Sequence, residues 1–236
     1  MSTTTTVAKR EIRAYFNSPV AYIVVTVFML IVGYLYWSQL FLEKQAELRY
    51  YFNLTPLVFT FIIPAITMRL ISEEKGSGTL EMLITMPVRD WQVVLGKFLA
   101  GIAMLTAIVG MTAFYALTLA WLSPVDKGPI LTGYLGLLLM GGSYIAIGVM
   151  ASSLTRNQIV AFILAFAISF ALFIFGQIVQ YAPDWLQPVL AFLSMGNHFE
   201  SMSRGVIDTR DVLFYGSLMV VALVIATASL ESRKWK

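Results

Sequence analysis

The sequence contains no cysteine, and this absence removes several kinds of chemistry at once. A disulfide framework, a thiolate metal site and a cysteine nucleophile are all excluded. The single histidine, His198, has no HExxH pattern around it, and no G-x-S-x-G motif occurs. No pair of aspartates lies within the long apolar stretches. Proteolysis by a metal, serine or aspartate mechanism is therefore disfavoured.

The phosphate-binding motif G-x-x-x-x-G-K-[ST] is also missing. The pair Gly96-Lys97 is followed by Phe98 and opens an apolar stretch, where no phosphate cradle can form. We therefore expect that the chain is not an enzyme, has no catalytic residues, binds no cofactor or metal, and does not itself hydrolyse ATP.

Charged side chains are scarce. Only 12% of the 236 residues are Asp, Glu, Lys or Arg, whereas 58% are hydrophobic, and the mean hydropathy is +0.79. Soluble domains carry roughly 25% charged residues and could not hide so much apolar surface. The bilayer must be the solvent of this chain. The formal charge of +3 then reflects basic cytoplasmic loops rather than nucleic-acid binding.

Long apolar runs predict an all-α integral membrane protein with six transmembrane helices in a single domain, residues 1–236. Pro56 and Pro64 interrupt the second of these runs. The expected spans lie near residues 19–42, 54–71, 98–122, 131–154, 158–181 and 212–230.

The distribution of basic residues orients these spans. With the N-terminus inside, eleven basic residues face the cytoplasm and five face outward, as the positive-inside rule requires. Both termini are then cytoplasmic, and we expect a multi-pass protein of the bacterial plasma (inner) membrane. The outward five are Lys44, Arg49, Lys127, Arg204 and Arg210.

Two further segments lie outside the spans. Residues 7–16 place apolar side chains on one side and Lys9, Arg10 and Arg13 on another, which predicts an interfacial helix. A merely basic tail is the alternative. Between Asp184 and Asp211, the apolar run 185–195 is too short to cross a bilayer. It predicts a re-entrant or interfacial outer segment before the last span.

The longest predicted cytoplasmic loop, residues 72–97, has internal structure of its own. Gly76 and Gly78 free the backbone, residues 79–86 read as a short helix, and Pro87 ends it. Leu80, Leu83 and Ile84 form one apolar face of this helix, and Met82 and Met86 form another. Two apolar faces call for two partners, of which the second could be another protein. A tightly packed interfacial loop explains the pattern equally well.

The run from Glu73 to Glu81, with Pro87 and Gly96-Lys97 after it, resembles the signature loop of type-2 ABC exporter permeases. In that family the loop contains a coupling helix that seats in a cleft of the ATPase subunit. The resemblance implies that acidic residues position the helix against basic groups of the ATPase. The implied coupling residues are Glu73, Glu74, Gly76, Gly78, Thr79, Leu80, Glu81, Met82, Leu83, Met86 and Pro87.

The end of the chain is similar to the GldF-like branch of these permeases. The matching residues are 205–208 before the last span and 233–235 after it. An auxiliary membrane subunit with a large outer domain would accompany that branch.

Small residues four apart predict close helix packing. On span four they are Gly142 with Ala146 and Gly148 with Ser152. On span five they are Ala161, Ala165 and Ser169. In type-2 exporters spans one and five meet a second permease, so the span-five set is a candidate dimer interface, with packing inside one chain as the alternative.

The family resemblance also implies a pathway lined by spans two and five. Its mostly apolar walls would suit a hydrophobic or amphipathic cargo, although the phenylalanines could equally face lipid or core. The candidate lining residues are Phe59, Thr60, Thr67, Phe173 and Gln177.

Two functions follow as hypotheses. In the first, the chain and an identical or related second permease export a substrate, driven by two copies of a separate ABC ATPase that hold ATP and Mg. In the second, the chain is a mechanotransmitter that rearranges an extracytoplasmic partner without passing cargo. A proton- or sodium-coupled carrier is disfavoured because the spans hold almost no ionisable residue.

Topology can be tested directly in this cysteine-free chain. Single cysteines are introduced at six basic positions, and intact cells are treated with an impermeant thiol reagent. We expect labelling at the outer three positions and none at the inner three, because the basic-residue count places them on opposite sides. Labelling at position 75 would contradict the orientation. The outer positions are Lys44, Lys127 and Arg210, and the inner ones are Lys75, Arg156 and Lys234.

Overall fold

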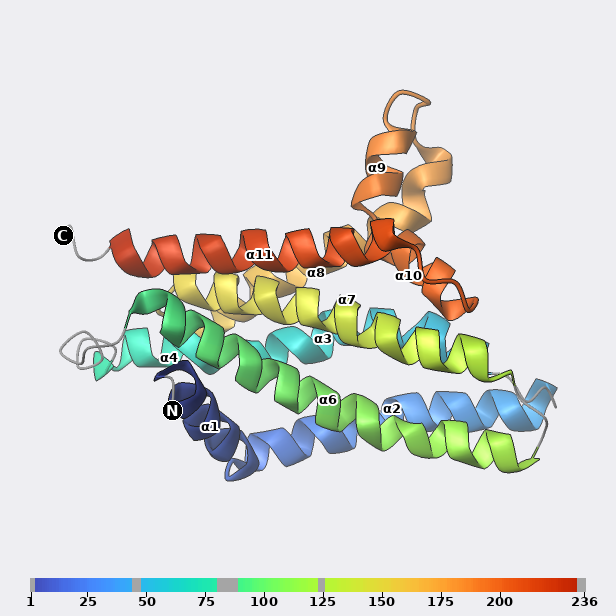
Figure 1. The fold of residues 1–236 in the computed structure, drawn as a ribbon, viewed down its shortest axis with the longest axis horizontal. Coiled ribbons are helices and arrows are strands. Elements are labelled where there is room, and N and C mark those ends of the chain that lie inside the picture. Colours follow the sequence, from blue (N-terminus) through green and yellow to red (C-terminus); the bar gives the residue numbers. More distant parts are fainter. Residues whose placement is uncertain (1–2, 44–47, 80–88, 123–125, 233–236) are drawn as a thin grey trace.

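The computed structural model describes residues 3–43, 48–79, 89–122 and 126–232, and all regular structure within these ranges is helical. Figure 1 shows long helices running side by side, with both chain ends at one end of the bundle. We call this end the terminal end and the opposite one the distal end. The helices are α1 (Thr3–Phe16), α2 (Pro19–Glu43), α3 (Arg49–Thr67), α4 (Arg69–Gly76), α6 (Asp90–Leu122), α7 (Lys127–Leu154), α8 (Gln158–Ile178), η1 (Val179–Tyr181), α9 (Gln187–Leu193), α10 (Met195–Ser203) and α11 (Thr209–Glu231).

Six helical stretches in the described residues are long and apolar enough to cross a membrane. They are α2, α3 with α4, α6, α7, α8 with η1, and α11. This confirms the six predicted spans, and α2 and α8 begin and end within a few residues of the expected bounds. The length of the apolar runs identified them, because a single segment inside the hydrocarbon can form all its backbone hydrogen bonds only as a helix.

The helices on either side of the predicted loop are longer than expected. α4 continues the second span to Gly76, and α6 begins at Asp90 rather than near residue 98. Gly96 and Lys97 therefore lie inside α6 instead of opening a span. The N-terminal helix is also longer, because its first turn includes the threonine run 3–6. Hydropathy could not mark these ends, since the extra turns carry charged or polar residues that are stabilised by tertiary contacts.

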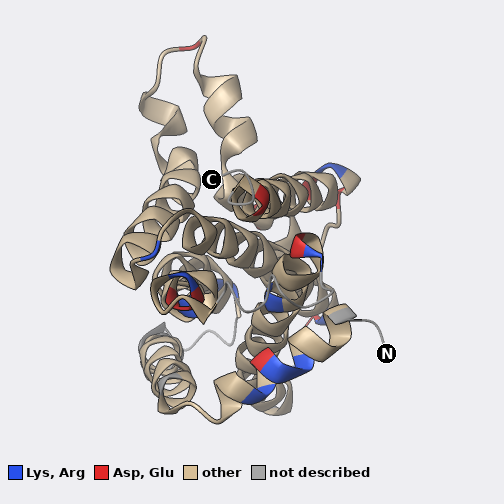
Figure 2. Cartoon of the chain, turned by 90° about the vertical axis from the view of Figure 1, so that its left-hand side faces the viewer, with Lys and Arg blue, Asp and Glu red and all other residues tan. Residues whose placement is uncertain are grey.

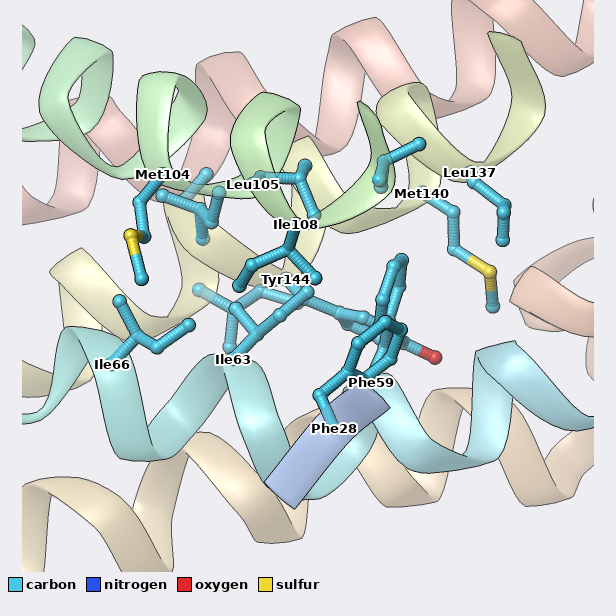
Figure 3. Close-up of a cluster of buried hydrophobic side chains, with 14 of the residues drawn as sticks. Phe28, Phe59, Ile63, Ile66, Met104, Leu105, Ile108, Leu137, Met140 and Tyr144 are labelled. Atoms are coloured by element: carbon cyan, nitrogen blue, oxygen red, sulfur yellow. The ribbon is translucent and has the colours of Figure 1, made fainter. Parts of the chain in front are cut away.

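α7 is the central helix. In its apolar stretch 78% of the residues are buried inside the chain, against 17% for α8 and 22% for α11. The core lies between α2, α3, α6 and α7, where Phe28 stacks on Phe59 with a ring-centroid distance of 5.7 Å. Figure 3 shows these rings meeting side chains from α6 and α7. The lightly buried helices α8 and α11 present most of their apolar surface to the surroundings.

Two glycines allow helices to approach closely. A Cβ atom built on Gly148 of α7 would lie 1.9 Å from Oγ1 of Thr67, so α3 and α7 could not meet there with any larger residue. A Cβ on Gly96 of α6 would lie 2.8 Å from the Val7 side chain of α1. Contact distances this short are not seen for real Cβ atoms, and overpacking of a core is destabilising.

The residues between α8 and α11 form the short 3-10 helix η1 and two short α-helices, α9 and α10, at the distal end. α9 projects sideways from the bundle (Figure 1), and it leaves Trp185 and Phe192 exposed. α10 packs back on the bundle, with Met195 and Met202 fully buried.

Gly148→Ala should lower the free energy of unfolding by about 2 kcal/mol, since the new methyl group forces α3 away from α7. Gly110→Ala is the matched control, because it is also a mid-helix glycine but a Cβ there meets nothing within 4 Å. The measurement is thermal unfolding of each purified variant. Equal unfolding temperatures for the two variants would contradict the close approach.

Candidate functional site

Three helices meet at the terminal end through a cluster of four charged residues, which we call the charged junction. It consists of Arg10 and Glu11 of α1, Glu74 of α4 and Lys97 of α6. The Lys97 ammonium lies 3.0 Å from Oε1 of Glu74 and 3.4 Å from Oε1 of Glu11. Figure 2 views this end, where basic and acidic positions lie together on α1, and further charged positions lie on neighbouring helices.

Arg10 lies on the exposed side of the charged junction and contacts both carboxylates. Its Nη2 atom lies 2.7 Å from Oε1 of Glu11 and 3.2 Å from Oε1 of Glu74. The hydrogen bond to Glu11 is the main reason that the pKa of Arg10 is raised above its ordinary value. Two acidic and two basic side chains thus balance one another.

The local sequence explains how Lys97 can be buried. Gly96 lets α1 lie directly against α6, and α1 then covers the lysine beside it. The side chain of Lys97 is only 1% exposed. A buried ammonium is tolerated when opposite charges compensate it, and here one carboxylate comes from α1 and another from α4. The junction therefore holds α1 and α4 to the start of α6.

A cavity of about 620 Å³ opens beside the junction. Arg69 lies at its wall, 3.6 Å from Oε2 of Glu73 and 3.4 Å from Oγ of Ser18. Tyr15 is buried at another wall and donates a hydrogen bond of 3.0 Å to the carbonyl of Ile66. Its burial raises the pKa of the Tyr15 hydroxyl, which keeps it a donor. α1 is thus anchored to the end of α3.

A second set of contacts fastens α4 to the end of α7. Nζ of Lys75 donates to the carbonyl of Ser153, which also accepts from Oγ of Ser229 at 2.9 Å. The backbone of Gly76 passes so close to Arg156 that a Cβ would lie 3.0 Å from its carbonyl oxygen. α4 is therefore held between α1 and α6 on one side and α7 on the other.

The structure describes only some of the predicted coupling residues. Glu73 is exposed, whereas Oε1 of Glu74 is engaged by Lys97 and Arg10 inside the chain. Glu74 therefore serves the charged junction, whereas Glu73 is paired with Arg69 of its own helix and is the more exposed of the two. Gly78 has a φ of +74°, which favours glycine, and Thr79 is exposed. Leu80, Glu81, Met82, Leu83, Met86 and Pro87 lie outside the described residues.

The other candidate residues fall mostly inside the bundle. Phe59, Thr60 and Thr67 are fully buried in the core, so they line no open space in this conformation. Phe173 is half-buried and Gln177 is exposed. Ala161, Ala165 and Ser169 are also fully buried within the single chain. These small residues therefore pack α8 against the chain's own helices, which is the alternative given above. Their side chains cannot touch a second permease in this conformation.

The distal end contains a different polar contact. Nδ1 of His198 in α10 lies 2.7 Å from Oδ1 of Asp211 in α11, and its Nε2 lies 2.9 Å from the carbonyl oxygen of Phe192. The imidazole also stacks on Phe214 at a ring-centroid distance of 4.1 Å. His198 thus joins α9, α10 and α11. Within the described ranges no three His, Cys, Asp or Glu side chains come together as metal ligands.

Sequence reasoning missed the charged junction. The sequence alone places Lys97 in a basic loop and does not distinguish Glu11. A signal was present, because Glu11 is the only acidic residue in a basic N-terminal segment and Lys97 follows a glycine. Neither signal predicts that Glu11 and Lys97 form a pair, since 86 positions separate them in the chain.

A bundle of apolar helices long enough to cross a membrane, with charged residues at its two ends and no cluster of metal ligands among the described residues, is typical of the membrane subunit of a transporter. A family model described as ABC-2 family transporter protein matches residues 5–235. The chain belongs to this family and is an integral membrane protein of the ABC transporter permease type.

Curated relatives agree with the family. The chain is 25% identical over 181 residues to the protein described as probable multidrug ABC transporter permease YbhR of Escherichia coli strain K12. The same match is found with that protein from Escherichia coli O157:H7. The alignment covers 74% of this chain and 48% of the relative, so the chain spans about half the length of the curated relatives it matches.

Lys97→Met should lower the free energy of unfolding by about 3 kcal/mol, because it removes the buried cation from the Glu11 and Glu74 carboxylates and leaves them only the more exposed Arg10. Adding Glu11→Gln and Glu74→Gln should restore most of the loss. As a control, Glu200→Gln breaks the exposed pair with Arg204 and should cost less than about 1 kcal/mol. Thermal unfolding of the purified proteins measures all three. A loss that the added glutamines do not relieve would mean that charge balance is not what Lys97 provides.

Proposed function

We propose that the chain is the permease subunit of an ATP-driven ABC transporter and couples a separate ATPase to the export of a substrate. The observation that carries this proposal is the family match over residues 5–235, together with the six apolar helices. ATP and Mg bind in the partner, and the terminal end of the bundle faces the cytoplasm.

The geometry near the expected coupling segment supports this role. α6 has 33 residues and so measures about 50 Å, well beyond the roughly 30 Å of hydrocarbon. α6 and α4 both continue past the membrane and flank residues 77–89. A force applied to this segment would reach the second and third spans directly, and the charged junction would pass it on to α1. Rigid elements of this kind convert a displacement at one end into a rearrangement of packed helices.

A working transporter requires a second permease, either a copy of this chain or a related one, and two ATPase subunits. Since the small residues of α8 are used inside the chain, the second permease would meet other surfaces, for which the lightly buried helices α8 and α11 offer apolar faces. The word multidrug in the relative's name suits an apolar or amphipathic cargo.

The alternative is a mechanotransmitter that acts on an extracytoplasmic partner, within a GldF-like branch. One observation favours it: the projecting α9 segment leaves Tyr181, Trp185 and Phe192 exposed at the distal end. These aromatic side chains could equally mark the headgroup level of the outer leaflet.

The methionine face of the coupling segment provides the test. Met82→Asp combined with Met86→Asp should release the ATPase, because burying a methionine contributes about 1.5–3 kcal/mol and a carboxylate in the same cleft adds a desolvation penalty. A loss of about 3 kcal/mol is more than a hundredfold in affinity. The tagged chain is isolated from membranes that contain its cognate ATPase, and bound ATPase and ATP turnover are measured.

Leu83→Asp is the matched variant on the opposite face, which is expected to pack against the permease. It should lower the thermal stability of the isolated chain, whereas the methionine variant should leave that stability unchanged. An ATPase that still binds and turns over ATP normally with the methionine variant would contradict the coupling role. A purified permease that hydrolyses ATP without any ATPase would contradict the proposed function as a whole.

A further inference from the structure

The second span is divided at Met68, and a side chain from another helix occupies the division. α3 ends at Thr67 and α4 begins at Arg69. The hydroxyl of Ser152, from α7, lies 3.0 Å from the backbone nitrogen of Ile71 and 2.9 Å from that of Ser72. It also lies 2.9 Å from the carbonyl oxygen of Met68. Ser152 is fully buried, so these contacts are made without water.

The hydrogen bonds of this hydroxyl are balanced. A serine hydroxyl has one hydrogen to donate and two lone pairs that accept. Ser152 donates to Met68 and accepts from Ile71 and Ser72. The first four N–H groups of a helix have no partner within it, and Ile71 and Ser72 are the third and fourth residues of α4. Ser152 therefore caps α4 from a neighbouring helix, a role that Met68 cannot perform because it has no side-chain acceptor.

The surroundings make this division a natural joint. Pro64, inside α3, lacks an N–H group and so weakens the helix one turn before Met68. Gly148 lies one turn before Ser152 on α7, and its missing side chain lets α7 come close enough for the hydroxyl to reach in. Side chains that insert into a helix ladder are a known cause of helix bending.

We propose that the Met68 division is a hinge in the second span and that Ser152 is the positioning residue that holds α4 in its observed place after α3. The hydroxyl keeps the α4 backbone paired at the joint. It therefore replaces the backbone hydrogen bonds that a continuous helix would form at this point, without making the joint rigid. The use of this hinge for transport rests on the proposed function, whereas the hinge itself is a property of the chain alone.

Ser152→Ala removes one oxygen atom and tests both parts of the proposal in the full chain reconstituted in lipid nanodiscs. Hydrogen exchange should become about tenfold faster at the amides of Ile71 and Ser72, since each loses its acceptor. Spin labels on cysteines at positions 77 and 231, both exposed, report the position of α4 relative to the end of α11. α4 is about 12 Å long, so a tilt of about 20° should shift or broaden that distance by about 4 Å.

Ser153→Ala is the matched control. Ser153 is the next residue and is equally buried, but its hydroxyl donates to Met150 within α7 and not to α4. The control should behave as the unsubstituted chain in both measurements. Faster exchange and a displaced α4 in Ser152→Ala alone would support the hinge.

Three results would overturn it. If both measurements match those of the control, Ser152 does not hold the joint. If exchange rises while the distance stays the same, the hydroxyl is a helix cap and no hinge exists. If Ser152→Ala abolishes the thermal unfolding transition, the residue supports the whole bundle. Since no ATPase is present, each of these results leaves the proposed permease function standing.

Discussion

The arrangement of the terminal end depends on how the buried ammonium of Lys97 is compensated. An isolated charge removed from water is very unfavourable, so the chain must bring carboxylates to it. The two carboxylates come from α1 and α4, which are otherwise separate elements. One lysine therefore draws both α1 and α4 to the start of α6. The close approach at Gly96 is the steric condition for the same arrangement.

The same end of the bundle combines firm and adjustable contacts. α4 is tied to α6 and α1 by ion pairs, and to α7 by Lys75 and Ser152. Ion pairs tolerate small changes of angle, whereas the packing of Gly148 against Thr67 does not. Movement would therefore concentrate at the joint and leave the packed part of α3 in place. This division between a rigid span and a hinged extension is what a lever requires.

The apolar pattern of the chain was sufficient to predict the six spans and a helix before the first of them, since hydrocarbon thickness and helix geometry constrain these elements strongly. It was not sufficient for the ends of α4 and α6, because contacts between distant residues such as Glu11 and Lys97 stabilise those turns. The small residues of α8 illustrate another limit. Spacing alone predicts close packing, but it does not say whether Ala161 meets its own chain or a second one. Ser152 was noticed only for its size, although its hydroxyl is what the structure uses.

The charged junction also has a consequence for biogenesis. Glu11 leaves the ribosome long before Lys97, because 86 positions separate them along the chain. Until α6 is synthesised, Glu11 lacks the Lys97 ammonium and α1 lacks the Gly96 surface against which it packs. Its final seat forms after the second and third spans have been inserted, when Gly96 and Lys97 arrive together. α1 thus reaches its final place only after helices that follow it in the chain.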